Sequence, residues 1–350
     1  MKTIFAYRIK TARKIKAYSL QTVADKVGIS KQMISKYENG LSMPDSTKLI
    51  QLANIFEVKP DYFFQPINVQ LENVKFRKKY KYSKSKIDSL KYRITNHLEN
   101  YLTIENILSI KSEFSNPIKN IVINSFLDIE KSSEILRKKW NIGSDPIHSI
   151  ISLLEANAIK VIEISEPEKQ FDGLSTIIKN KYPVIVINKN FEIERKRFTL
   201  LHELGHLLLN INSKFDEKEE EKICNRFAGS MLIPIEILYR EIGQKRKTVS
   251  VNELINFQEQ FGISISALVY RLNDLEIITN NKKKGYFIAR NQNKHLKEIA
   301  DQSRFIGKEF SERFERLVYK ALSQEIITIS KASSFLNIDI STINRNLSII

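Results

Sequence analysis

The residues His-Glu-Leu-Gly-His at positions 202–206 have types and a spacing that suit metal chemistry. Two histidines four residues apart share one face of a helix, so both imidazoles can reach the same ion. Two neutral ring nitrogens and one carboxylate are a ligand set that Zn²⁺ favours, and a fourth position is left for water. Glu203 follows the first histidine and is placed to accept the proton of that water. The pattern therefore predicts His202 and His206 as metal ligands and Glu203 as the catalytic base.

The segment that carries this pattern is expected to be a helix from about residue 192 to residue 210, and its other side chains are largely apolar. Histidines without partners would be unfavourable in such a buried helix. Two other interpretations remain open. The helix could be buried with hydrogen-bonded histidines and no metal, or it could bind zinc without catalysis. The second arises because no residue is identified that would stabilise the oxyanion; Tyr239 and Tyr270 are candidates only by lying downstream.

The third metal ligand should be an acid from a nearby element. Glu219, Glu220 and Glu221 all stand at the start of the next expected helix, from about residue 219 to residue 231. Spacing alone does not choose among them.

Three blocks around the histidine pattern, at residues 197–209, 221–228 and 231–234, resemble the ImmA/IrrE zinc peptidases. The resemblance extends over about residues 130–280 and implies a zincin-like domain with a small sheet. It implies Glu221 as the third zinc ligand, and a repressor protein of a mobile element or stress regulon as the substrate. Cys224 departs from the family pattern, which usually has alanine there.

Residues 20–40 have the pattern of a helix-turn-helix. Ala24 is small enough for helix packing, Gly28 suits the turn, and Ile34 is expected to anchor the second helix to the core. Glutamine can pair with adenine, and lysine with guanine or phosphate. The expected DNA-contacting residues are Gln21, Lys31, Gln32, Met33, Ser35 and Lys36.

Residues 4–64, with the pattern Ser-x-x-x-Ile-Ser-x-Tyr-Glu-Asn-Gly, resemble the Xre/Cro-type repressors. The alternative is a plain helical bundle with a solvated basic face. The formal net charge of +16 and the pI of about 9.6 favour an anionic partner such as DNA. A dimer is expected because such repressors usually read two half-sites.

A chain of 350 residues is too long for one compact core, so two or three domains are expected. A single cysteine excludes a disulfide framework. No apolar run is long enough to span a membrane, and the charged N-terminus does not fit a signal peptide. We therefore expect a cytoplasmic protein without a membrane partner.

The predicted fold is mainly α with a small β-sheet, an α+β chain. Strands are expected at residues 159–164 and 184–187, and a loop at 280–285. The expected domains are a helix-turn-helix domain at 1–66, a basic helical connector at 67–140, a zinc peptidase domain at 141–280 and a helical module at 281–350.

Two features are secondary. Residues 75–93 carry nine basic residues and one acid, which suits either phosphate contacts or a solvated linker helix. Residues 328–345 echo the first helix-turn-helix, with Asn337 in the turn place of Gly28. Because Arg345 is the only cation of the corresponding recognition face, they are interpreted as a packing or partner module rather than a second DNA reader.

Two functional hypotheses follow. The first is a DNA-binding transcriptional regulator with a zinc endopeptidase, which cuts a repressor-type protein or itself to control transcription. The second is a non-catalytic repressor or antitoxin-like regulator whose zinc domain is a sensor or partner-binding module.

Overall fold

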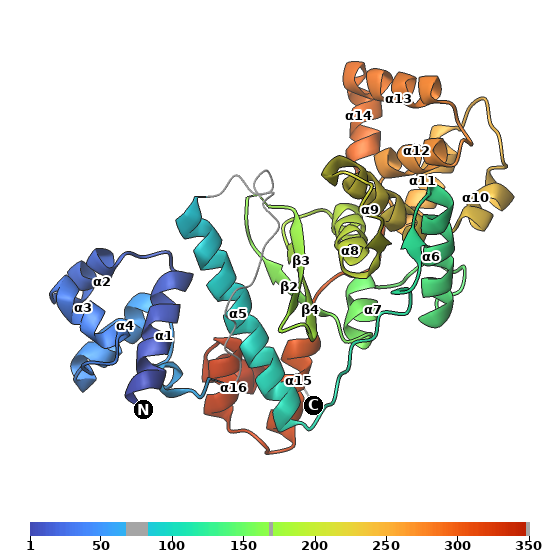
Figure 1. Ribbon diagram of the computed structural model, residues 1–350. Coiled ribbons are helices and arrows are strands. Elements are labelled where there is room, and N and C mark those ends of the chain that lie inside the picture. Colours follow the sequence, from blue (N-terminus) through green and yellow to red (C-terminus); the bar gives the residue numbers. More distant parts are fainter. Residues whose placement is uncertain (68–82, 168–170, 348–350) are drawn as a thin grey trace. The chain divides into compact units, whose positions relative to one another are not determined.

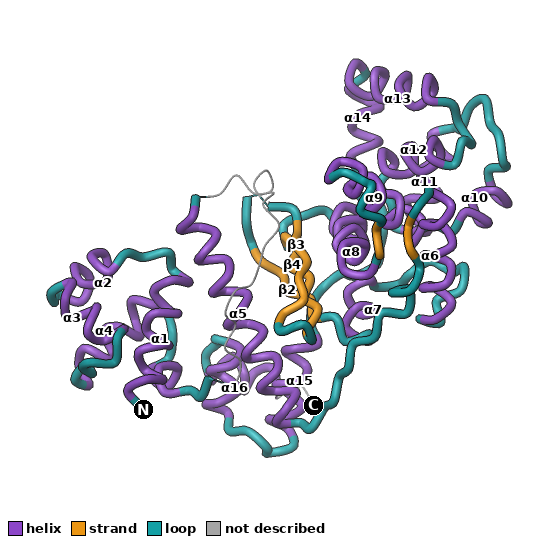
Figure 2. Tube along the Cα trace, in the orientation of Figure 1, coloured by secondary structure: helices purple, strands orange, loops and turns teal. Residues whose placement is uncertain are grey.

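The structure is a computed structural model that describes residues 1–67, 83–167 and 171–347 (Figure 1). Over these residues the chain is mainly helical with two small β-sheets, which confirms the predicted α+β class (Figure 2). It divides into two compact units. We call residues 1–67, 83–112 and 312–347 the terminal unit, and residues 113–167 and 171–311 the central unit. None of the described helices is both long and apolar enough to cross a membrane.

The terminal unit begins with short helices, and side chains cap the first turns of the second, third and fourth of them. Ser19, Ser30 and Asp45 each accept a hydrogen bond from the backbone N–H three residues later. The apolar faces of these helices meet in one core that includes Phe5 and Ile34. The elements are α1 (Lys2–Ile15), α2 (Leu20–Val27), α3 (Lys31–Glu38), α4 (Ser46–Phe56) and the 3₁₀ helix η1 (Pro60–Phe64).

A long helix, α5 (Lys84–Ile107), joins the two ends of the sequence within the terminal unit. Arg8 of α1 donates two hydrogen bonds of 2.7 Å to the carboxylate of Glu99 on α5, and both side chains are buried. Further along α5, Tyr101 packs with Phe314 in a second apolar core. The helices of that C-terminal part are α15 (Arg313–Ser323), α16 (Ile329–Leu336) and α17 (Ile340–Leu347).

The segment expected as a connector, residues 67–140, contributes to both units. Its helix α5 belongs to the terminal unit, whereas α6 (Phe126–Lys139) belongs to the central unit. Residues 75–82 of the basic run lie outside the described residues. The domain boundaries at 66, 140 and 280 stay predictions.

The central unit contains a three-stranded sheet in the order β2-β4-β3. β2 (Lys160–Ile164) is parallel to β4 (Tyr182–Asn188), and β3 (Gly173–Ile178) is antiparallel to β4 at the edge. β2 and β4 lie where the runs of β-branched residues predicted strands. A second sheet pairs the two-residue strands β1 (Val122–Ile123) and β5 (Asn210–Ile211).

Two helices at the centre of this unit position the histidine pattern. α8 (Ile193–Leu208) packs against β3 and β4, and α9 (Glu217–Leu232) packs against α8 and α6. α7 (Ile150–Ala156) covers β2. The remaining helices are α10 (Ile235–Glu241), α11 (Val251–Phe261), α12 (Ile265–Asp274), α13 (Asn280–Gln292) and α14 (Lys294–Asp301).

The prediction of a loop at residues 280–285 is wrong, because these residues form the first turns of α13. The side chain of Thr279 accepts a hydrogen bond from the Lys282 N–H and so caps the helix. The run of asparagines and lysines resembles a loop because it carries no apolar side chain, and the helix packs instead through Tyr286 and Phe287 further along.

Candidate metal centre and nucleic-acid interface

His202 and His206 lie one turn apart on α8 and point the same way. The opposite face of the helix is buried through residues such as Leu201 and Leu204, which fixes the direction of the two imidazoles. Their Nε2 atoms are 3.1 Å apart. The side chain of His206 is 5% exposed and that of His202 is 14% exposed, so both rings are mostly buried but keep some contact with solvent.

Glu221 of α9 approaches both histidines. Its carboxylate oxygens lie 3.1 Å from Nε2 of His206 and 3.4 Å from Nε2 of His202. Tetrahedral Zn²⁺ with bonds of about 2.0–2.1 Å holds its ligand atoms about 3.3 Å apart. The three side chains therefore lie close enough together to hold one zinc ion.

The other two acids at the start of α9 are directed elsewhere. Glu219 forms a capping box with Asp216, since each side chain bonds the other residue's backbone N–H. Glu220 lies 3.7 Å from Nδ1 of His206, on the far side of the ring from Nε2. Spacing left three candidates for the third ligand, and the fold brings Glu221 to the Nε2 atoms.

The second nitrogens of both rings have partners on α9. Nδ1 of His202 is 2.9 Å from Oδ1 of Asn225, and Nδ1 of His206 is 3.2 Å from the sulfur of Cys224. A carbonyl oxygen at Nδ1 holds the proton there and leaves the Nε2 lone pair for a metal. The sequence analysis assigned no role to Asn225, although its place four residues after Glu221 puts it on the same helix face.

Gly205 allows the two helices to approach each other this closely. A β-carbon there would lie 3.2 Å from the ring of Phe227 and 3.4 Å from Cα of Cys224. A larger residue would push α9 away from α8 and Glu221 away from the histidines.

Glu203 points toward the edge strand β3. The hydroxyl of Ser175 on β3 donates a hydrogen bond of 2.7 Å to its carboxylate. Gly173 of the same strand brings the backbone close, since a β-carbon there would lie 3.1 Å from the carbonyl oxygen of Val186 and 3.4 Å from Cγ of Glu203. Ser175 could not be found from the sequence, because a serine in a strand carries no motif.

Two sequence families match this chain where these features lie. Residues 154–273 match the IrrE N-terminal-like domain of the M78 peptidases, and residues 9–63 match a helix-turn-helix family. The chain joins an Xre-type helix-turn-helix domain to an IrrE/ImmA-like domain. The resemblance to both families found from the sequence is confirmed, although the matched ranges are narrower than residues 130–280 and 4–64.

Three curated relatives come from Bacillus subtilis (strain 168). The SPbeta prophage-derived uncharacterized HTH-type transcriptional regulator YonR is 38% identical over 69 residues, which are 20% of this chain and 64% of that protein. The uncharacterized HTH-type transcriptional regulator YqaE is 37% identical over 18% of this chain and 53% of its own length. The HTH-type transcriptional regulator ImmR is 32% identical over 19% of this chain and 52% of its own length.

The chain thus matches about half to two thirds of the length of these relatives. Among solved structures, apo ComR from S. thermophilus is 13% identical, covering 85% of this chain and 97% of its own. Its TM-score of 0.18 supports no argument about this fold.

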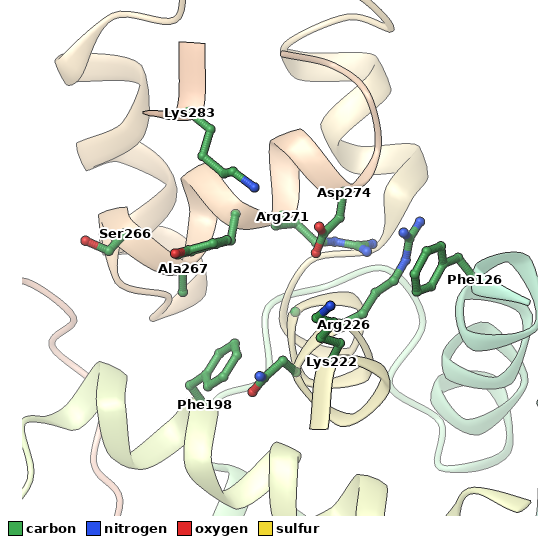
Figure 3. A pocket seen from close by; sticks show the side chains of 12 residues that line it. Phe126, Phe198, Lys222, Arg226, Ser266, Ala267, Arg271, Asp274 and Lys283 are labelled. Atoms are coloured by element: carbon green, nitrogen blue, oxygen red, sulfur yellow. The ribbon is translucent and has the colours of Figure 1, made fainter. Parts of the chain in front are cut away.

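A cavity of about 620 Å³ adjoins the candidate metal centre of the IrrE-like domain. Asn225 of α9 lines it, as do Lys283 and Asp274, which face the same space as Lys222 of α9 (Figure 3). Burial raises the pKa of Asp274, although Arg226 and Arg271 act in the opposite direction. Tyr270 also lines the cavity, whereas Tyr239 packs against the core.

The helix-turn-helix domain presents α3 as its outer helix. Ile34 is fully buried, and Gly28 takes the left-handed conformation (φ 71°) that ends α2. Gln21, Lys31, Gln32 and Lys36 are exposed, and Met33 and Ser35 are half-buried. Three of these six have internal contacts.

Gln21 donates a hydrogen bond to Asp25 of its own helix, and Ser35 accepts one from Asn39. Met33 packs at the rim of the core. Lys31, Gln32 and Lys36 therefore form the part of the expected DNA-contacting set that extends furthest outward.

Proposed function

We propose that this protein is a DNA-binding transcriptional regulator whose IrrE-like domain is a zinc-dependent endopeptidase. The observation that carries the proposal is the meeting of three ligand atoms, from His202, His206 and Glu221. The helix of the two histidines also carries Glu203, the residue that follows His202 in the sequence. The substrate class is a repressor-type protein or this chain itself, and its cleavage controls transcription.

The chemistry is hydrolysis of a peptide bond. A zinc ion at His202, His206 and Glu221 would supply a Lewis acid for the carbonyl oxygen and the attacking water. Glu203 accepts a proton from that water as its oxygen bonds the carbonyl carbon. Glu203 then donates the proton to the departing nitrogen as the C–N bond breaks, so the carboxylate is regenerated. Ser175 holds the carboxylate in place during both transfers.

Two features of the IrrE-like domain support a peptide substrate. β3 is an edge strand, so an extended peptide can pair with it by backbone hydrogen bonds. The cavity beside Asn225 offers space for a side chain, and Lys222 and Lys283 on its wall favour an acidic one.

The DNA half of the proposal rests on the helix-turn-helix domain and on the charge. Lys31, Gln32 and Lys36 are exposed on α3, and the chain carries +16 overall. The partner is a double-stranded operator, read by a homodimer at two half-sites.

A regulator without catalysis is the second candidate. The relatives are named as transcriptional regulators, which supports regulation; each matches 18–20% of this chain. In this second candidate the zinc centre is a sensor or a partner-binding module.

The substitution Glu203→Gln separates the two candidates, because it removes the proton acceptor and leaves the three metal ligands. Wild type and variant are expressed in cells and their proteomes are compared for new protein N-termini. Glu220→Gln, a neighbouring acid outside the proposed ligand set, is the matched control. We expect N-termini that appear with wild type and with Glu220→Gln but not with Glu203→Gln, at equal zinc content. Identical N-termini in all three would refute the peptidase.

A further inference from the structure

The C-terminal helices repeat the architecture of the first helix-turn-helix. α16 begins and ends 309 residues after α2, and α17 begins and ends 309 residues after α3. α15 stands at the place of α1, inside its corresponding range. Residues 313–347 therefore form three helices in the same order as their N-terminal counterparts. α16 is as long as α2, and α17 is as long as α3.

Burial follows the same offset. Each of the following pairs has both members at most 7% exposed, and the members of a pair occupy equivalent positions. The pairs are Phe5 and Phe314, Ile9 and Val318, Ala12 and Ala321, Val23 and Ala332, Ala24 and Ser333, and Ile34 and Ile343. The two triple-helix bundles thus share one packing pattern.

The turn between the two helices is also the same. Gly28 has φ 71° and ψ 41°, and Asn337 has φ 53° and ψ 42°. Asparagine tolerates this left-handed conformation better than most residues with a β-carbon. Ser19 caps α2 and Thr328 caps α16, and each side chain accepts a hydrogen bond from the backbone N–H three residues later.

Both bundles are attached to α5 by an arginine of their first helix. Arg8 pairs with Glu99, and Arg313 donates a hydrogen bond of 2.6 Å to Glu105. The apolar side of the second bundle packs with Tyr101 and Ile104 of the same helix. This leaves the outer face of α17 away from the core.

That outer face carries side chains that can read bases. Ser341, Asn344 and Arg345 are exposed and take the places of Gln32, Ser35 and Lys36. Asparagine pairs with adenine and arginine with guanine in the major groove, each through two hydrogen bonds.

In place of the packing or partner module expected from the sequence, we propose that residues 313–347 are a second helix-turn-helix and that α17 reads duplex DNA. The inference rests on the proposed function in that the first helix-turn-helix also binds DNA. The place of Lys31 is taken by Ile340, so α17 presents fewer cations than α3. Its contribution is therefore base preference more than attraction to phosphates.

The experiment is selection of duplexes from a random pool by the full-length protein, followed by sequencing. One variant removes the outer face of α17 (Asn344→Ala with Arg345→Ala), and another removes that of α3 (Gln32→Ala with Lys36→Ala). Arg316→Ala is the matched control, because it removes an exposed cation of α15. Thermal melting checks that each variant is folded, and methylation protection of guanine N7 on the selected duplex provides an independent measurement.

We expect wild type and Arg316→Ala to select two separate blocks of conserved bases. In the α17 variant, the preference for the conserved bases over other bases at one block should fall by about 5- to 150-fold. The protection of guanine N7 at that block should be lost as well. The α3 variant should lose the other block.

Selection of the same blocks with the same protection by the α17 variant would overturn this inference, and would favour a protein partner for α17. If wild type selects no sequence, the proposed DNA binding fails as well. The two failures are thereby distinguished.

Discussion

Ser175 and Glu203 are joined by a hydrogen bond of 2.7 Å that ties the edge strand β3 to the histidine helix α8. The bond involves the carboxylate proposed to move the proton. Replacing Ser175 by alanine should lower the turnover of the Glu203-dependent substrate by about 10- to 100-fold, because a hydrogen bond to a charged group is lost. Zinc content should not change, since Ser175 contacts no ligand atom of the proposed set. Unchanged turnover at equal zinc content would show that the bond does not serve catalysis.

Glu221→Ala should lose metal. Wild type purified without added metal is expected to contain about one zinc per chain, measured by elemental analysis. The variant should contain much less, because only two ligands remain. Glu220→Ala removes the same charge one residue away and should keep its zinc. Equal zinc in all three proteins would refute Glu221 as the third ligand.

Glu99→Ala should destabilise the terminal unit by about 3–5 kcal/mol, because Arg8 is left buried without its carboxylate. The double variant Arg8→Met with Glu99→Leu should recover most of this loss, since no unpaired charge remains. Hydrogen exchange of the α5 amides reports the stability of this unit. Exchange that is as slow in Glu99→Ala as in wild type would contradict a stabilising pair.

The stability of the terminal unit should depend on His97. Burial lowers the pKa of His97 to about 4, and its ring lies 5.1 Å from that of Phe314. The unfolded chain binds this proton below about pH 6.5. The contribution of neutral His97 to the free energy of unfolding is therefore complete above pH 6.5. It is lost as the pH falls toward 4, and the loss is about 1–3 kcal/mol in total.

His97→Gln should remove this part of the pH dependence, because glutamine does not titrate. Urea unfolding between pH 7 and pH 4.5 measures it for both proteins. Parallel stability profiles would show that His97 is not kept neutral by the fold.

DNA binding should weaken steeply with salt. Each phosphate contact releases counterions, so the logarithm of the association constant should fall with a slope of about −0.9 per contact against the logarithm of the salt concentration. Lys36→Ala should reduce this slope by about 1 if Lys36 contacts a phosphate. An affinity that is flat between low and high salt would contradict the electrostatic account.

The sequence by itself determined the local parts of this protein. The four-residue spacing of His202 and His206 placed both rings on one helix face, and the apolar periodicity around Gly28 predicted two short helices and a turn. These features depend on contacts within a few residues, so a helix or turn period is enough to find them.

The family resemblance implied Glu221 as a ligand, but the contacts between distant residues are decided only in the tertiary structure. That structure brought Glu221 to the Nε2 atoms and Glu220 to Nδ1 of His206, and it engaged Glu219 in a capping box. It placed Ser175 against Glu203 and Asn225 against His202. It also joined both ends of the chain on α5. These choices depend on how helices and strands pack across tens to hundreds of residues, and no spacing along a single chain records that packing.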